Sequence, residues 1–368
     1  MTKNITLRQV LYTYILMMLS PIIRHLPNYI TKTSGPGGYV SILFGTLFSL
    51  IIIFSVRYLV KAFPAMNLYE ILESTVTVIG AKIIIALYAL WALFNITAKI
   101  QFYAITCQTT LISHSKATLL FSVILLIVAY CLYKGIKSAF RLSELLLVMF
   151  VIIIGLLAAI CFRDFDYLNL LPLTLEGSVK SIRAVPATIN VVGFIFIVLF
   201  FSDCFDKKYT SIKPYMRAGL CVAAISFVIT LVSIGINGAQ LTSKLTFPFY
   251  AVVRRSAFFN ILERLEAFVV IPSIVSDFVY ICVFSAIFLL CIKWLFGLYD
   301  TKFLIVPVLV LIYFFSLVSL KTQFESDMFY YNVLIYLNTV FLYVFPIVVS
   351  LIAFVKNKIT KSKKEASA

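Results

Sequence analysis

Long runs of apolar residues, separated by short polar connections, make up most of the chain. A helix that crosses a bilayer needs about 20 mostly apolar residues, and these runs approach or exceed that length. The pattern predicts an all-α integral membrane protein with a single transmembrane domain over residues 1–368. Ten spanning helices are expected, approximately at residues 7–30, 38–60, 83–103, 117–133, 142–162, 185–202, 215–236, 266–292, 302–320 and 332–355.

Two stretches between the spans have apolar residues at helical spacing with charges on the other face. Residues 67–80 read NLYEILESTVTVIG and predict a helix at the membrane interface. Residues 247–266 read FPFYAVVRRSAFFNILERLE and have an amphipathic pattern. This second stretch is interpreted either as a plain surface helix or as an outer gate or partner-docking element.

The first apolar run is interrupted by Pro21 and Pro27, with Arg24 and His25 between them. Each proline removes a backbone donor and clashes with the preceding turn. Within a membrane, a broken helix is tolerated only where the freed backbone groups face protein or a water-filled cavity. The run therefore predicts either a ligand site at the break, near Ser20–Pro21, or a proline-kinked span without a ligand.

The sixth run also carries helix breakers, Pro186, Asn190 and Gly193. Ten spans divide into five plus five, so this run opens the second half as the first run opens the first half. Interrupted spans at corresponding positions of two halves point to a transporter fold with an inverted repeat. We therefore expect a 5+5 inverted repeat in which helices 1 and 6 are broken.

Basic residues outnumber acidic ones by 31 to 15, a formal net charge of +16. In a soluble protein this excess would suggest nucleic-acid binding, but 62% of the residues are hydrophobic and only 12% are charged, which excludes a soluble domain. The Lys and Arg residues lie mainly in short loops, as topology signals do. Their distribution favours two cytoplasmic termini, a basic cytoplasmic tail at 356–368, and the lipid bilayer rather than nucleic acid as partner.

The sequence contains no pattern typical of an enzyme or a metal site. The seven cysteines form no C-x-x-C pair and lie in or beside apolar runs, so we interpret them as buried hydrophobic residues. Two histidines, His25 and His114, are too few for a His-based metal centre. Phosphate-loop, G-x-S-x-G and H-E-x-x-H motifs are also missing. We expect no enzyme, no cofactor, no metal and no cleaved signal peptide before the first span.

Several segments together resemble one family. They are ITLRQVLYTYILMM at the start, SGPGGYVSILFGTLFSL after the first run, Phe63-Pro64 followed by Gly80, KGIKSAFRLSELLLVMFVI, and FPFYAVVRRSAFFNILERLEAF. In their order and spacing they resemble the B-type subunit of bacterial spore germinant receptors, within the amino acid–polyamine–organocation transporter superfamily. The chain departs from the family at Tyr39 and at Val270-Ile271-Pro272, where tryptophans are frequent. Its first run also lacks the paired glycines that many of these transporters have.

The resemblance implies a LeuT-like fold and a receptor subunit that binds a small nutrient, such as an amino acid, and triggers germination. It implies an A-type membrane subunit and a C-type lipoprotein as partners, in the inner membrane of a spore. A secondary active amino acid transporter of the same fold is the alternative. An assembly scaffold with a vestigial pocket is a third hypothesis.

The family fold also implies which residues line the site. Broken helices offer free amides and positive dipole ends to a carboxylate, and unwound carbonyls to an ammonium. Ser20, Pro21, Ile22 and Ile23 would contribute from the first span. Residues from the sixth span would face them, namely Asn190, Val192, Gly193 and Phe194. Ordinary packing is the alternative for each of these side chains.

Two charged residues within predicted spans are candidates for contact with a ligand. Asp277 lies near the middle of span eight, where a carboxylate is costly and usually faces the bundle interior or water. It would contact a ligand ammonium or a cation, or form a structural pair. Lys99 in span three would meet Asp277 or a ligand carboxylate, or extend outward to the interface. Thr97 and Gln101 add polar groups to the same span.

Further charges lie near the ends of the spans. Arg24 and His25, just past the predicted break, would steer anionic groups inward or occupy a solvated loop. Glu263, Arg264 and Glu266 open span eight and would form a local charge network, a partner contact or a solvated helix start.

Overall fold

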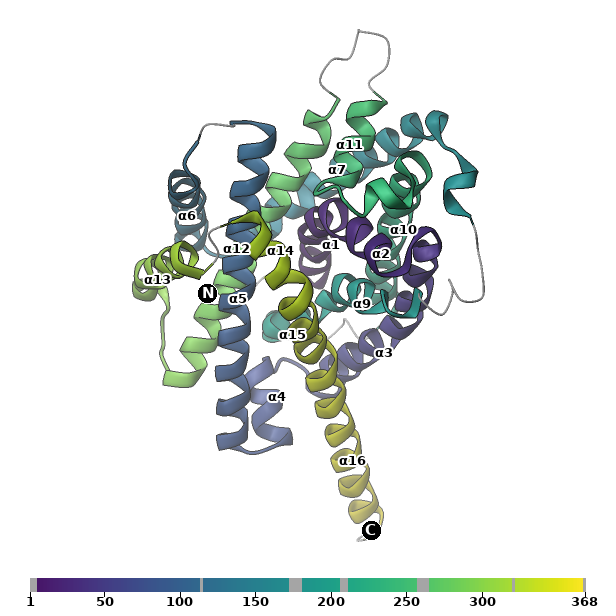
Figure 1. The fold of residues 1–368 in the computed structure, drawn as a ribbon. Helices are drawn as coiled ribbons and strands as arrows, with labels where there is room; N and C mark the ends of the chain where they lie inside the picture. The colour runs from purple at the N-terminus through teal and green to yellow at the C-terminus, as the bar shows by residue number, and fades with distance from the viewer. Residues whose placement is uncertain are drawn as a thin grey trace.

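The computed structural model describes residues 5–112, 115–171, 181–205, 211–256, 265–319 and 322–366, and within these ranges it is helical apart from short connections (Figure 1). His114 and the Glu263–Arg264 pair, discussed above, lie outside the described residues. Long apolar sequences form helices here because a helix satisfies every backbone group internally, as the hydrocarbon of a membrane requires. The expectation of an all-helical membrane protein is confirmed.

The first half of the chain contains five of the spans and a short helix between them. Its elements are α1 (Leu7–Arg24), α2 (Leu26–Ser34), η1 (Pro36–Tyr39), α3 (Val40–Ala62), α4 (Leu68–Thr75), α5 (Val78–Thr110), α6 (Ala117–Lys134), α7 (Lys137–Cys161), η2 (Phe162–Asp164) and η3 (Tyr167–Leu170). The helix expected at the interface is α4, and a capping box between Asn67 and Glu70 begins it. The third span, α5, is longer than residues 83–103, because Thr77 caps its start.

The second half contains the other five spans. Its elements are α9 (Val185–Gly193), η4 (Phe194–Cys204), α10 (Lys213–Thr242), α11 (Pro248–Arg255), α12 (Ala267–Phe296), η5 (Lys302–Leu304), α13 (Ile305–Ser319), α14 (Gln323–Phe329), η6 (Tyr330–Leu334), α15 (Ile335–Thr339), η7 (Val340–Val344) and α16 (Phe345–Ala366). Within the amphipathic stretch, α11 forms the first part, and residues 257–264 lie outside the described residues. The last span is a composite, in which η6 and η7 are π-helical segments between α-helical ones.

The number of spans depends on how the first two helices are counted. Within the described residues, nine helical stretches are long and apolar enough to cross a membrane, and the bent pair α1–α2 makes a tenth. Each of the ten predicted ranges overlaps one of these stretches. The bundle therefore has the length and composition of a ten-span membrane protein.

The break in the first span lies at His25 and not at Ser20–Pro21. A capping box between Thr6 and Gln9 starts α1, which then runs through Pro21 to Arg24. There the chain bends by 50° into α2. The ring of a proline clashes with the carbonyl four residues earlier, so Pro27 disfavours a continuous helix between Ile23 and Leu26. Pro27 itself lies in the first turn of α2, where a missing N–H is tolerated.

The sixth span changes its geometry rather than unwinding. It begins as α9, with Pro186 in the first turn, and becomes a 3-10 helix at Phe194. A further kink occurs at Phe201, whose φ is −118° and ψ is 15°. About nine-tenths of its apolar window is buried. Helices 1 and 6 are therefore both interrupted, as expected, but the first is interrupted at His25 and not at Ser20–Pro21.

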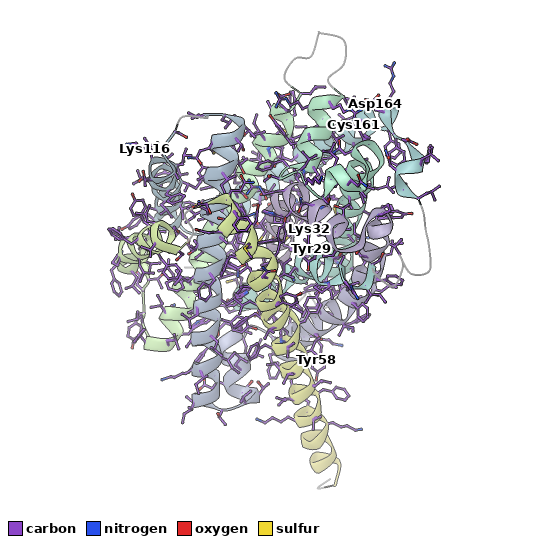
Figure 2. All side chains as sticks on the ribbon, in the orientation of Figure 1. Tyr29, Lys32, Tyr58, Lys116, Cys161 and Asp164 are labelled. Carbon is purple, nitrogen blue, oxygen red and sulfur yellow. The ribbon has the colours of Figure 1, made fainter. Side chains whose placement is uncertain are left out.

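The centre of the bundle is built on α1, α5 and α12. The helices α5 and α12 pack along each other, and α1 packs against α7, α10 and α12. Figure 1 shows α6 and α13 at the periphery, α11 at one end of the bundle, and α4 with the end of α16 at the other. We call these ends the α11 side and the α4 side. Tyr58, labelled in Figure 2, marks the region where α3 runs beside α16.

Candidate ligand-binding site

An ion pair lies at the centre of the bundle. Lys99 of α5 places its Nζ 2.9 Å from Oδ1 of Asp277 on α12. The side chains are 6% and 0% exposed. The two side chains therefore form a buried ion pair. The pair answers one question that the sequence left open: Lys99 does not extend outward to the interface.

The same pair touches the first span through Ser20. Lys99 Nζ donates to Ser20 Oγ over 3.3 Å, and the backbone N–H of Ser20 donates to Ser276 Oγ over 3.0 Å. Three spans, α1, α5 and α12, therefore meet at one polar point. Polar contacts of this kind between membrane helices are worth about 0.6–2 kcal/mol each, so they stabilise the bundle only moderately.

A second polar network adjoins the pair. Asn338 Oδ1 accepts from Trp91 Nε1 at 2.7 Å and from Asn95 Nδ2 at 3.1 Å. Asn95 Oδ1 in turn accepts from the Tyr280 hydroxyl at 2.8 Å. The Tyr280 ring lies 4.9 Å from Lys99 Nζ, a cation–π distance. This network ties α15 of the last span to α5 and α12, beside the ion pair.

A small cavity lies where these elements meet the two broken spans. It leaves about 20 Å³ for the centre of a water-sized sphere, which is room for about one water molecule. Residues of α1, α5, α9, η4, α12 and the last span line it. They are Met18, Pro21, His25, Asn95, Ala98, Lys99, Phe102, Asn190, Val191, Phe194, Tyr280, Tyr330, Leu334 and Asn338.

The cavity brings together some of the residues expected from the sequence and leaves others aside. Pro21, Lys99, Asn190 and Phe194 line it directly. Ser20 and Asp277 contact Lys99 without lining the cavity. The remaining expected residues lie within the protein but not on the cavity wall: Ile22, Ile23, Thr97, Gln101, Val192 and Gly193.

Helical geometry explains why some expected residues lie elsewhere. Residues two positions apart on a helix do not share a face, so Thr97 and Gln101 point away from Lys99. Thr97 bonds to the carbonyl of Leu93 in its own helix. On α9, Val192 accepts a hydrogen bond from Tyr14 through its carbonyl. Gly193 gives space to a neighbour, since a Cβ there would overlap the Tyr343 ring.

Aromatic rings close the cavity toward the α11 side. The His25 ring lies 4.3 Å from Phe102 and is stacked on Tyr330 at 4.5 Å. The next residue, Tyr331, lines a pocket of about 310 Å³ that opens on the surface. Tyr29 and Lys32 of α2, labelled in Figure 2, both lie against Tyr331. Neighbouring tyrosines of one π-helical segment thus face the cavity and the α11-side pocket.

A second series of aromatic contacts runs from the cavity toward the α4 side. Phe194 on the cavity wall stacks on Trp91, which contacts Tyr88, and Tyr88 contacts Phe200. Phe200 stacks on Trp294 at 6.1 Å, and both line a pocket of about 370 Å³ on the α4 side. Aromatic rings therefore pack on both sides of the small cavity, and a ligand larger than water requires them to move.

Residues 4–324 match the family described as spore germination protein. The chain belongs to the spore germination protein family. Among relatives in Bacillus subtilis (strain 168), it is 24% identical to the spore germination protein YfkT over 275 residues, 73% of this chain and 75% of that protein. It is 23% identical to spore germination protein YndE over 280 residues, 75% and 77% of the two chains.

Two solved structures share the fold of this chain. One is MhsT in complex with L-phenylalanine, with a TM-score of 0.65 and 11% identity, covering 96% of this chain and 99% of that one. Another is Mhp1, a nucleobase-cation-symport-1 family transporter with bromovinylhydantoin bound, with a TM-score of 0.58 and 12% identity over 88% and 74% of the chains. This spore germination protein therefore has the LeuT-like fold, and the expected 5+5 architecture is confirmed.

Several residues of the site in this spore germination protein were missed from the sequence. Asn95 and Asn338 lie within apolar runs, and polar residues there generally face other helices, so that signal was available. Tyr280 follows Asp277 by three positions and shares its helix face. The stacking of His25 on Tyr330 had no local signal, because 305 positions separate the two residues.

Arg24 differs most from its expected setting. Neither it nor His25 lies in a solvated loop: each side chain is only 2% exposed. The Arg24 guanidinium lies 5.3 Å from the Phe102 ring and 4.9 Å from the Phe247 ring. The bend at His25 turns the chain into the protein, and with it these two polar side chains.

Proposed function

We propose that this chain is the nutrient-sensing membrane subunit of a spore germinant receptor, with an amino acid or a similar small molecule as the nutrient. One observation carries the proposal: the buried Lys99–Asp277 pair beside a small cavity between the two broken spans. Ionisable residues inside a membrane protein are costly and usually mark a ligand or ion path. The family membership supports the link to germination.

The small size of the cavity suggests how binding becomes a signal. With room for about one water molecule, it admits a nutrient only after the surrounding rings separate. A ligand that binds the opened arrangement more tightly than the closed one shifts the population toward it, by no more than its difference in affinity. The shift would pass to an A-type membrane subunit and a C-type lipoprotein in the spore inner membrane, with both termini of this chain cytoplasmic.

A secondary active amino acid transporter is the second candidate, and the fold of MhsT and Mhp1 supports it. Uptake separates the two functions. Purified protein in proteoliposomes, given labelled amino acids, accumulates label if it transports. A sensor binds the same compounds without accumulation.

The proposal is tested in spores of the native organism. Deletion of the gene should abolish germination in response to at least one member of a nutrient panel. In the complemented strain, Lys99→Met/Asp277→Leu should give normal protein abundance and no response, because replacing a whole buried ion pair by apolar residues is often neutral for stability. Asp164→Asn, at an exposed residue labelled in Figure 2, is the control and should respond normally. An unchanged half-maximal nutrient concentration in the double variant would exclude the pair from the site.

A further inference from the structure

The buried charges of the described chain do not balance. Among the described residues, the Asp, Glu, Lys and Arg side chains that are almost inaccessible to solvent are Arg24, Lys99 and Asp277, two basic groups and one acidic group. Lys99 is paired with Asp277. Arg24 is left over, and none of its three guanidinium nitrogens has a hydrogen-bond partner among the described residues. A guanidinium has five N–H donors and stays charged, so this is a large unsatisfied group.

The surroundings of Arg24 compensate this charge only in part. The rings of Phe102 and Phe247 each provide a cation–π contact worth about 0.5–2 kcal/mol. Burial of an ion costs several kcal/mol even after relaxation of the protein. Asp277 and Asp327 are close enough for their charges to act on Arg24, but neither forms a hydrogen bond with it. The site therefore offers an unused donor fork for an anion.

The position of Arg24 connects this fork to the cavity. Phe102, under the guanidinium, lines the cavity, and so does the adjacent residue His25. Asp327 lines the α11-side pocket, as does Thr246, the neighbour of Phe247. Arg24 thus lies between the α11-side pocket and the cavity. Nε2 of His25, the next residue in the chain, is a further buried atom without a hydrogen-bond partner among the described residues.

We propose that Arg24 binds a carboxylate of the ligand. The nutrient class is therefore small carboxylates, amino acids included, rather than neutral sugars, nucleosides or cations. Guanidinium and carboxylate match as two parallel hydrogen bonds, which fix the orientation as well as the affinity. This inference rests on the proposed function, because it assigns the ligand of the same site. Approach through the α11-side pocket brings the carboxylate to Arg24 before the rest of the ligand reaches the cavity.

The test uses the full-length protein in lipid nanodiscs and thermal unfolding with and without probes. The probes are the L-amino acids and their primary amides, which lack the negative charge. Arg24→Met removes the charge and keeps the length of the side chain, and Arg24→Lys keeps the charge without the fork. Arg217→Met, an exposed arginine of α10, is the matched control.

We expect at least one amino acid, and not its amide, to raise the unfolding temperature of the wild type. Arg24→Met should weaken that binding by about 10- to 100-fold, the range of a lost charge-assisted contact, and Arg24→Lys less. Without ligand, Arg24→Met should unfold at a higher temperature than the wild type, because an unpaired buried charge is gone. A purely structural Arg24 predicts the opposite shift, a lower unfolding temperature.

The outcomes separate the inference from the proposed function. Equal binding of acids and amides, or unchanged affinity in Arg24→Met, would overturn the role of Arg24 and leave nutrient sensing intact. A lower unfolding temperature of ligand-free Arg24→Met would overturn it as well. If no probe shifts the wild type, the assignment of an amino acid carboxylate to Arg24 fails, and nutrient sensing is decided separately by the germination test of the deletion strain.

Discussion

The two broken spans differ in what they bring to the centre of the molecule. The first span bends at His25 and carries Ser20, Arg24 and His25 into the interior, next to Lys99. The sixth span carries mostly apolar side chains and one amide, Asn190, whose Nδ2 is held by the carbonyls of Pro186 and Ile335. The difference suggests that the two spans have different roles. The first span provides polar and charged groups that recognise a charged ligand, and the sixth provides the apolar wall that sets the shape of the site.

The largest expected effect is on the charged side of this comparison. Asp277→Leu alone leaves Lys99 buried without a counter-ion, which should lower the free energy of unfolding by about 3–5 kcal/mol. Adding Lys99→Met should restore most of that loss. Thermal unfolding in detergent and abundance in membranes measure both variants. A double variant as unstable as the single one would mean that Asp277 acts through other partners.

A smaller effect is expected on the apolar side. Gly193→Ala adds a Cβ that overlaps the Tyr343 ring, and this ring is fixed by bonds from its hydroxyl to Ser49 Oγ and the Ile189 carbonyl. Overpacking of this kind typically destabilises by about 1–3 kcal/mol. Gly155→Ala, which meets no atom within 4 Å, is the control and should be neutral or slightly stabilising. Equal unfolding temperatures of the two variants would show that the structure around Gly193 can shift to accommodate the added Cβ.

The smallest effect concerns the prolines of the first span. Pro21 lies within a continuous helix, so Pro21→Ala should add a backbone hydrogen bond and leave the nutrient response nearly unchanged. The variant should also be more stable than the wild type, by less than the ~3 kcal/mol that a proline costs relative to alanine inside a soluble helix. Pro27→Ala removes the clash that favours the bend, so it should lower the response more than Pro21→Ala does. The two variants are compared by measuring the germination rate of spores as a function of nutrient concentration. A stronger loss in Pro21→Ala would return the functional break to Ser20–Pro21.

Much of the fold was predictable, because hydrocarbon permits few backbone arrangements. The apolar runs indicated the spans, and the prolines indicated that the first span is broken. They did not tell which proline sets the bend, since that depends on how α1 packs against its neighbours. Asp277 and Lys99 were recognisable by the cost of a charge within a span, but not as a pair. The burial of Arg24 could not be predicted, because it follows from the direction of a 50° bend.

The two π-helical segments of the last span have a consequence for how its length can vary. In an α-helix of 3.6 residues per turn, deleting one residue rotates everything beyond it by about 100°. The hydrogen bonds of a π-helical turn span one residue more than those of an α-helical turn. Deleting one residue within η6 or η7 can therefore return that turn to α-helical geometry. The segments beyond the deletion would then keep their phase. A scan of single-residue deletions along residues 323–358 should find its tolerated positions within 330–334 and 340–344, which makes these ten positions the places where this helix can change length.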